Sequence, residues 1–124
     1  MATVLIVENN TPIYDSVHRV LSAHGHRVLR AYTGIEGIQQ AEAHTVDLIV
    51  IDIELPDMDG KGVAAALRTR PHLQNVPIVA LSNSDDPVIH GLIKAFGCND
   101  CIAKSIDTRS MPQQVVTYLE QFII

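Results

Sequence analysis

Tryptophan is absent from this sequence of 124 residues, and aromatic residues make up only 4% of it. Flat organic cofactors are usually held in pockets lined by aromatic side chains, so this scarcity argues against a cofactor of that kind. Cysteine occurs twice, which is too few for the disulfide framework of a small secreted domain. No segment approaches the roughly 20 apolar residues of a membrane-spanning helix, and no basic stretch precedes the first apolar run. We therefore expect a cytoplasmic protein without membrane contact.

Basic residues are also few. Nine Lys and Arg residues stand against 14 Asp and Glu residues, which gives a formal net charge of -5, and the basic side chains are scattered along the chain. Direct nucleic-acid binders usually concentrate positive charge on one face, so we expect no direct contact with nucleic acid. The apolar share of 47% and the charged share of 19% are typical of globular proteins. The length predicts a single domain spanning residues 1–124.

Short runs rich in Val, Ile and Leu alternate with segments of helical periodicity. The runs cover residues 3–7, 27–31, 47–52, 77–82 and 100–104. This alternation predicts repeated strand–helix units around a parallel sheet, an α/β fold with right-handed crossovers. The first, third and fourth runs are apolar without alternation, as strands covered by helices on both faces should be. We expect those three strands at the centre of the sheet.

Capping signals predict where the helices begin and end. We expect Thr11 to cap the first helix with Pro12 at its first position, and Gly25 to end it. Thr33 and Glu36 have the spacing of a capping box for a second helix that extends to about residue 44. Its inward face is predicted to carry Ile35, Ile38 and Ala41, and the later helices are predicted to begin at Asp59, Asp86 and Asp107. The last helix should bury Met111, Val115, Leu119 and Phe122.

Polar residues gather where the predicted strands end. They are Glu8, Asn9 and Asn10 after the first strand, Asp52 after the third, Ser82 and Asn83 after the fourth, and Lys104 and Ser105 after the fifth. Ligands of open parallel sheets bind beyond the carboxyl ends of the strands. Any one of these residues could simply cap a neighbouring helix, but together they suit the transfer of a phosphoryl group, which depends on positioning and charge neutralisation.

In that interpretation each group has a distinct task. Asp52 is the nucleophile, Lys104 offsets the charge of the acyl phosphate, and Ser82 donates a hydrogen bond to one of its oxygens. Glu8 and its neighbours would hold Mg²⁺ through carboxylate oxygens and water.

Four segments then carry a resemblance to a known family. "LIVEN", "DLIVIDIELPDMDG", "PIVALSN" and "AFGCNDCIAKS" resemble, in that order, the receiver domain of two-component response regulators of the chemotaxis-regulator type. The resemblance covers essentially the whole chain and implies a flavodoxin-like (βα)5 fold with strand order 2-1-3-4-5. It implies a signalling module and not an enzyme, phosphorylated on Asp52 by a histidine kinase or a phosphotransfer protein. Its site would use Asp52, Ser82 and Lys104, with Mg²⁺ held by Glu8, Asn9, Asp52 and Glu54.

Three positions depart from the family pattern. The family usually has a second acid where this chain has Asn9, and an amide brings no charge, so we expect weakened Mg²⁺ binding and slower phosphorylation. Cys101 replaces the aromatic residue that reports phosphorylation, so the switch either relies on Ser82 and backbone shifts or is blunted. Ser105 replaces a proline, so we expect a trans bond between Lys104 and Ser105.

These departures keep other interpretations open. The chain could be a degenerate receiver that binds proteins independently of phosphorylation; a flavodoxin-like cofactor binder is disfavoured because the loop "ENNTPIYDS" lacks glycine. The pair Cys98 and Cys101 follows a predicted helix, so we expect buried structural thiols and no redox pair. The histidines show no metal-binding pattern beyond the pair His24 and His26, which flank Gly25 in a predicted turn and are expected to be structural. Partners are expected on the face formed by the fourth helix, fifth strand and fifth helix, where a homodimer is one option.

Overall fold

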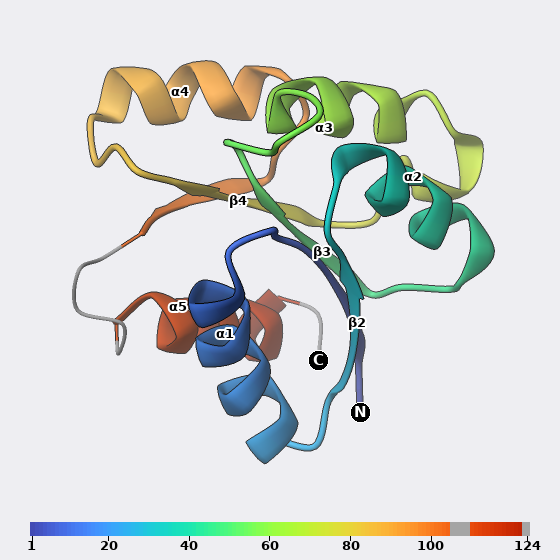
Figure 1. The fold of residues 1–124 in the computed structure, drawn as a ribbon, viewed down its shortest axis with the longest axis vertical. Helices are drawn as coiled ribbons and strands as arrows, with labels where there is room; N and C mark the ends of the chain where they lie inside the picture. The colour runs from blue at the N-terminus through green and yellow to red at the C-terminus, as the bar shows by residue number, and fades with distance from the viewer. Residues whose placement is uncertain (105–109, 123–124) are drawn as a thin grey trace.

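The computed structural model describes residues 1–104 and 110–122, and its elements alternate between strands and helices (Figure 1). The five strands are β1 Thr3–Val7, β2 Arg27–Ala31, β3 Leu48–Asp52, β4 Ile78–Ser82 and β5 Asp100–Ala103. The helices of the described residues are α1 Thr11–Ala23, α2 Gly34–Ala43, α3 Gly60–Arg68, the 3-10 turn η1 Pro71–Leu73, α4 Pro87–Ala95 and α5 Ser110–Phe122. All five predicted strands are therefore present, within one residue of the predicted bounds at each end.

The strands form one parallel sheet in the order β2-β1-β3-β4-β5. This is the predicted order, and β1, β3 and β4 are its three central strands. Every residue of β3 and of β4 is buried, which explains why their sequences show no alternation of apolar and polar residues. The register pairs Val7 with Ile51, and Asp52 with Leu81. The carboxyl ends of the central strands therefore lie side by side at one edge of the sheet.

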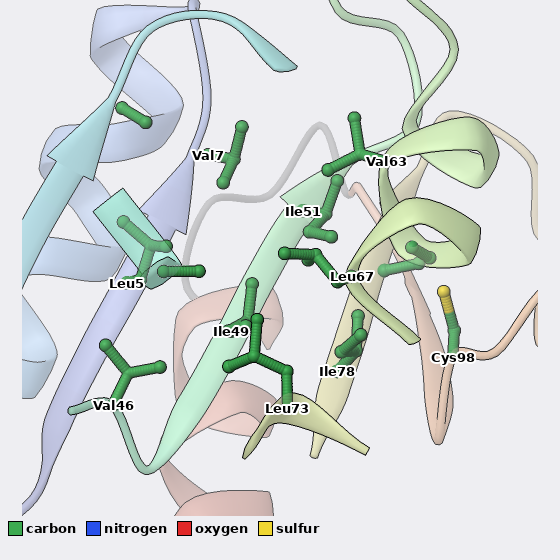
Figure 2. Packing of buried hydrophobic residues seen from close by; sticks show 14 of the residues in the cluster. Leu5, Val7, Val46, Ile49, Ile51, Val63, Leu67, Leu73, Ile78 and Cys98 are labelled. Carbon is green, nitrogen blue, oxygen red and sulfur yellow. The ribbon is translucent and has the colours of Figure 1, made fainter. Parts of the chain in front are cut away.

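Helices cover both faces of the sheet. In Figure 1, α1 and α5 lie together on one face, and α2, α3 and α4 lie on the other. Successive strand residues point to opposite faces, so β1 contributes Leu5 and Val7 to the core beneath α2 and α3, and Val4 and Ile6 to the core beneath α1 and α5. Figure 2 shows the first of these cores, in which Ile49 and Ile51 of β3 face α3.

The cap of α1 differs from the prediction by one residue. Asn10, and not Thr11, is the N-cap: its side-chain oxygen accepts a hydrogen bond of 3.1 Å from the backbone N–H of Ile13. Asn is as good an N-cap as Ser or Asp, and Thr11 with Pro12 then occupy the first helical turn. Gly25, with φ at +83°, follows the helix end as predicted, in a conformation that favours glycine.

Helix α2 also corrects one expectation. Thr33 caps it as predicted, but the Glu36 carboxylate accepts from the N–H of Tyr32, so the capping box is not closed on Thr33 itself. Ile35 was predicted to face inward and is 57% exposed. The buried positions are Gly34, Gly37 and Ala41. Small residues line this face because the helix lies close to the sheet: a β-carbon on Gly37 would lie 2.8 Å from a methyl of Val7.

The remaining helix starts follow the prediction where the structure describes them. Asp59 caps α3 through Lys61 N–H, and Asp86 caps α4 through Val88 N–H. Helix α5 buries Met111, Val115 and Leu119 as expected. Asp107, the Lys104–Ser105 bond and the Phe122 side chain lie outside the described residues. Within the described residues, no helix is long and apolar enough to span a membrane.

Candidate functional site

A cleft of about 310 Å³ opens at the carboxyl edge of the central strands. Its walls come from the loops after β1, β3 and β4 and from the end of β5. The residues that line it are Asn9, Asn10, Ile13, Asp52, Glu54, Leu55, Pro56, Asn83 and Lys104. The parallel topology thus brings together most of the polar residues that were predicted to meet at this edge.

Lys104 faces two buried carboxylates in this cleft. Its ammonium nitrogen lies 2.6 Å from Asp52 Oδ1 and 3.4 Å from Glu8 Oε1. All three side chains are at least nine-tenths buried. The backbone N–H of Lys104 also donates to the carbonyl of Ser82, which fixes the end of β5 against β4. Buried charges are stable only when they are paired, and Lys104 supplies the cation for both acids.

The pKa of Glu8 is raised, because this carboxyl is buried and lies beside a second carboxyl with only one ammonium group between the two. Burial raises the pKa of Glu8 to about 8, and the neighbouring Asp52 carboxyl acts in the same direction, against the opposing effect of Lys104. Glu8 Oε1 accepts no hydrogen bond within the described part of the chain, whereas Glu8 Oε2 accepts from Asn10 N–H at 3.3 Å. At neutral pH the Glu8 carboxyl therefore retains its proton.

The loop after β3 folds back onto Asp52. The N–H of Glu54 donates to Asp52 Oδ1 at 3.0 Å, a local turn typical of aspartate. Gly60 closes the loop by donating its N–H to the carbonyl of Ile53 at 2.9 Å. A β-carbon on Gly60 would lie 2.7 Å from the Ile53 α-carbon and would also strike the Asp52 carbonyl oxygen. The glycine of the "DIELPDMDG" segment is therefore required by the close approach of α3 to the end of β3.

Asp57 ties the same loop to a neighbouring helix. Its two carboxylate oxygens accept hydrogen bonds from Gly34 N–H at 2.7 Å and Ile35 N–H at 3.0 Å, at the start of α2. These bonds, led by the one from Gly34, hold the pKa of Asp57 below its usual value. Sequence reasoning did not assign this contact, because an aspartate in a loop gives no indication of which helix it caps.

The predicted metal ligands are not equivalent: Asn9, Asp52 and Glu54 line the cleft, whereas Glu8 is fully buried and is not part of its lining. Glu8 and Asp52 are buried, whereas Asn9 and Glu54 are exposed at the mouth. The Glu54 carboxylate accepts a hydrogen bond from the Asn83 side chain. Among the described residues, no three Asp, Glu, His or Cys side chains converge in a way that could hold a metal ion.

The oxygen atoms at this site are nevertheless of the kind that bind a hard divalent cation. Glu8 Oε1 is a buried carboxylate oxygen without a hydrogen bond, and Asp52 lies beside it. Mg²⁺ prefers oxygen ligands and is usually held by one or two carboxylates, with water or phosphate oxygens completing the shell. Two carboxylates and the Asn9 amide match that pattern. Position 9, after β1, carries this amide in place of an acid.

Ser82 lies at the edge of the site. It is buried at the end of β4 and lines a neighbouring groove between β4 and α4, together with Glu54 and Asn83. Its hydroxyl oxygen accepts a hydrogen bond of 3.1 Å from the N–H of Ser84. A hydroxyl that accepts on its oxygen can still donate its proton, so this contact orients Ser82 without using its donor.

The cysteines behave as structural residues. Cys98 and Cys101 are both free and buried, and they lie on either side of the start of β5. Burial raises the pKa of each thiol to about 11. A reactive or redox-active cysteine needs a lowered pKa, so the structure agrees with the expectation of structural thiols. Cys101, at the position where the family often has an aromatic residue, packs into the core beneath α3 and α4.

Two histidines meet a glutamate at the turn before β2. His24 Nδ1 lies 3.0 Å and His26 Nε2 lies 3.8 Å from Glu120 Oε2. His26 Nδ1 accepts a hydrogen bond from Ala2 N–H, so the neutral ring carries its proton on Nε2. A histidine that binds a metal through one ring nitrogen usually donates the N–H of the other nitrogen to an acceptor, whereas His26 Nδ1 accepts a hydrogen bond. The contact with Glu120 therefore joins α5 to the turn before β2.

Comparison with known proteins agrees with this geometry. The family model described as "Response regulator receiver domain" matches residues 4–116. The polar-differentiation response regulator DivK of Brucella ovis is 28% identical over 117 residues, which cover 94% of this chain and 95% of DivK. The CAI-1 autoinducer sensor kinase/phosphatase CqsS of Vibrio cholerae is 27% identical over 117 residues, but the chain spans only 17% of its length.

Solved structures give the same result. The chemotaxis response regulator CheY4 of Vibrio cholerae superposes with a TM-score of 0.87 at 26% identity, covering 94% of this chain and 98% of CheY4. The receiver domain of the sensor histidine kinase PA1611 of Pseudomonas aeruginosa, which holds a magnesium ion in its active site cleft, has a TM-score of 0.86 at 26% identity, with 98% and 97% of the two chains covered. The chain belongs to the response regulator receiver domain family of two-component phosphorelay systems.

Proposed function

We propose that this receiver domain accepts a phosphoryl group on Asp52 from a histidine kinase or a phosphotransfer protein in the cytoplasm. One observation carries the proposal: Asp52 is a buried carboxylate in an open cleft, and Lys104 Nζ lies 2.6 Å from its Oδ1. A carboxylate kept only for stability would be paired with a cation and closed off from a cleft. A carboxylate that must react needs both the paired cation and access for a donor.

The transfer is a displacement at phosphorus. A carboxylate oxygen of Asp52 attacks the phosphorus of a phosphohistidine, a P–O bond forms as the P–N bond breaks, and the imidazole leaves with a proton from solvent. Lys104 offsets the negative charge that develops on the phosphoryl oxygens. The Ser82 hydroxyl, oriented by Ser84 N–H, would donate its proton to one of these oxygens in the acyl phosphate.

Glu8, Asn9, Asp52 and Glu54 would hold Mg²⁺ at the mouth of the cleft. When bound, the ion would neutralise charge on the incoming phosphoryl group. We expect the site to be weak, since Asn9 supplies an amide oxygen in place of a second acid and a unit charge pair at 4 Å is worth roughly 4 kcal/mol at an effective dielectric of 20. The cost of desolvating an extra acid cancels part of this gross figure.

The output would pass through the face formed by α4, β5 and α5. Helix α4 exposes Val88 and Leu92, and Phe96 follows at its C-cap; these side chains are 71%, 59% and 47% exposed. Apolar side chains at this spacing form a single stripe along a helix. A downstream protein, an output domain or a second copy of this chain could cover that stripe.

The proposal is tested by mass spectrometry of the intact protein after incubation with phosphoramidate and Mg²⁺. We expect a gain of one phosphoryl group in the wild type and no gain in Asp52→Asn. No gain in the wild type, or a gain that persists in Asp52→Asn, would sink the proposal. In the first case a degenerate receiver that binds partners independently of phosphorylation becomes the better account.

A further inference from the structure

Arg30, near the end of β2, binds the backbone of the loop that carries Glu8 and Asn9. Its Nε and Nη2 donate to the carbonyl oxygen of Glu8 at 3.3 and 3.2 Å. Nη2 also donates to the carbonyl of Asn9 at 3.4 Å and to the hydroxyl of Thr11 at 3.1 Å. One guanidinium therefore contacts three of the four residues from Glu8 to Thr11.

Two aromatic rings fix the orientation of this guanidinium. The central carbon of Arg30 lies 4.2 Å from the ring centre of Tyr14 on α1 and 4.0 Å from that of Tyr32 after β2. Cation–π contacts of this kind are favourable, and rings that contact a planar guanidinium restrict its rotation. The chain has only three tyrosines, and two of them contact this one side chain.

The same loop segment is attached to β2 from its other side as well. Glu8 N–H donates to the carbonyl of Ala31 at 3.0 Å. The peptide groups on both sides of Glu8 are thus fixed by β2, one by its backbone and one by the Arg30 side chain. The direction in which Glu8 and Asn9 project into the cleft depends on those peptide planes.

We propose that Arg30 is a positioning residue for the metal-binding loop: it orients Glu8 and Asn9 by holding their carbonyl groups. This inference rests on the proposed function, because it takes these two side chains as the ligands of Mg²⁺. Because position 9 carries an amide in place of an acid, the geometry of the remaining ligands matters more. Loss of a group that hydrogen-bonds to a metal-binding residue without touching the metal often lowers metal affinity by about 10- to 100-fold.

The sign of one substitution separates this role from a simple charge effect. A guanidinium near a cation site repels the cation. If Arg30 acted only through its charge, removing that charge would therefore tighten Mg²⁺ binding. Removing a positioning residue would weaken it. Lysine retains the charge but cannot form the planar, forked contact of arginine, so Arg30→Lys separates charge from geometry.

The experiment compares three variants by isothermal titration calorimetry with Mg²⁺ alone. We expect Arg30→Met to weaken Mg²⁺ binding by about tenfold and Arg30→Lys to weaken it as well. Arg27→Met is the matched control: it removes the same charge from the opposite end of β2, where Arg27 pairs with Thr3, and it should leave the affinity within about twofold. Unchanged or tighter binding in Arg30→Met would overturn the proposal.

A second measurement does not require the metal to bind. Amide hydrogen exchange at residues 8–10 in the metal-free protein should be faster in Arg30→Met and Arg30→Lys than in Arg27→Met. Equal exchange rates in all three variants overturn the positioning role, even in a protein that binds no Mg²⁺. Failure of the wild type to bind Mg²⁺, with faster exchange in the Arg30 variants, would instead count against the proposed function while leaving the loop contact established. If Arg30→Met does not fold, the same two measurements on Arg30→Lys decide the question.

Discussion

Lys104 Nζ and Asp52 Oδ1 lie 2.6 Å apart at the base of the cleft, and their side chains are only 10% and 5% exposed. A buried ion pair of this kind is costly to break, because either charge alone would be left without a partner in a poorly solvated position. Under the proposed function, phosphorylation of Asp52 would keep a negative group beside Lys104 and would move that charge outward onto the phosphoryl oxygens. Lys104 would then keep a negatively charged partner while the geometry of the contact changes, and this change would act on the end of β5.

The raised pKa of Glu8 predicts how stability depends on pH. The folded state retains the Glu8 proton up to about pH 8, whereas the unfolded chain releases it near 4.5. The folded state therefore binds more protons between these values, and this contribution to the free energy of unfolding is complete below pH 4.5 and falls as pH rises to 8. Each unit of pKa shift is worth about 1.4 kcal/mol, so a loss of a few kcal/mol is expected.

Urea unfolding of the metal-free wild type and of Glu8→Gln at pH 5 and pH 8 measures this contribution. Glutamine cannot ionise, so the fall in unfolding free energy between the two pH values should be smaller in Glu8→Gln. Titrating groups remote from residue 8 are the same in both proteins and cancel in the comparison. Equal falls in the two proteins would mean that Glu8 is not the proton-binding group.

Asn9→Asp should tighten Mg²⁺ binding. The new carboxylate restores a charge at the mouth of the cleft, and even after desolvation is subtracted we expect a gain of about tenfold or more, equivalent to ~1.4 kcal/mol. Calorimetric titration with Mg²⁺ measures it. Asn10→Asp is the matched control because it adds the same charge one position further on, at a side chain that caps α1 through Ile13 N–H. Equal effects at both positions would indicate a general charge effect and no direct ligand role for residue 9.

Gly60→Ala should destabilise the protein and disturb the Asp52 loop. A β-carbon there would lie 2.7 Å from the Ile53 α-carbon, so the backbone must shift, at a cost of about 1–3 kcal/mol. Gly62→Ala is the control on the same helix, where a β-carbon meets only the Met58 methyl at 3.6 Å. Alanine is the better helix former, so Gly62→Ala should be neutral or stabilising by up to about 1 kcal/mol. Thermal unfolding of both variants gives the comparison, and equal stabilities would contradict the close approach at Gly60.

The thiols of Cys98 and Cys101 should be inert in the folded protein. Both are buried and their pKa values are raised to about 11, so almost no thiolate exists at pH 8. A chromogenic disulfide reagent should react with them slowly under native conditions and rapidly in urea. Rapid labelling of the folded protein, or a disulfide between the two residues, would revive the redox interpretation.

The sequence predicted the sheet well because its signals are local and strong. Apolar runs placed all the strands, and the three runs without alternation became the three central strands. Helix faces were predicted less accurately, since hydrophobicity alone does not show where small residues allow close packing. Ile35 was assigned to the core for its side chain, but Gly34 and Gly37 form the buried face of α2.

The sequence predicted which residues would gather at the end of the sheet better than it predicted the contacts among them. Strand topology places Asp52, Lys104 and Glu8 together, because parallel strands end at the same edge. The raised pKa of Glu8 depends on burial and on the distance between two acids, which the sequence does not encode locally. Arg30 was missed for a related reason: its partners are backbone carbonyls, and no residue pattern marks a carbonyl as an acceptor.

Localisation of the phosphoryl group tests the central claim most directly. The wild-type protein is treated with phosphoramidate and Mg²⁺ and then with borohydride, which reduces an acyl phosphate to an alcohol, and its peptides are sequenced by tandem mass spectrometry. We expect the reduced residue at position 52, dependent on both phosphoramidate and Mg²⁺. Modification at another carboxylate, or an unreduced Asp52 in protein that has gained a phosphoryl group, would contradict the account.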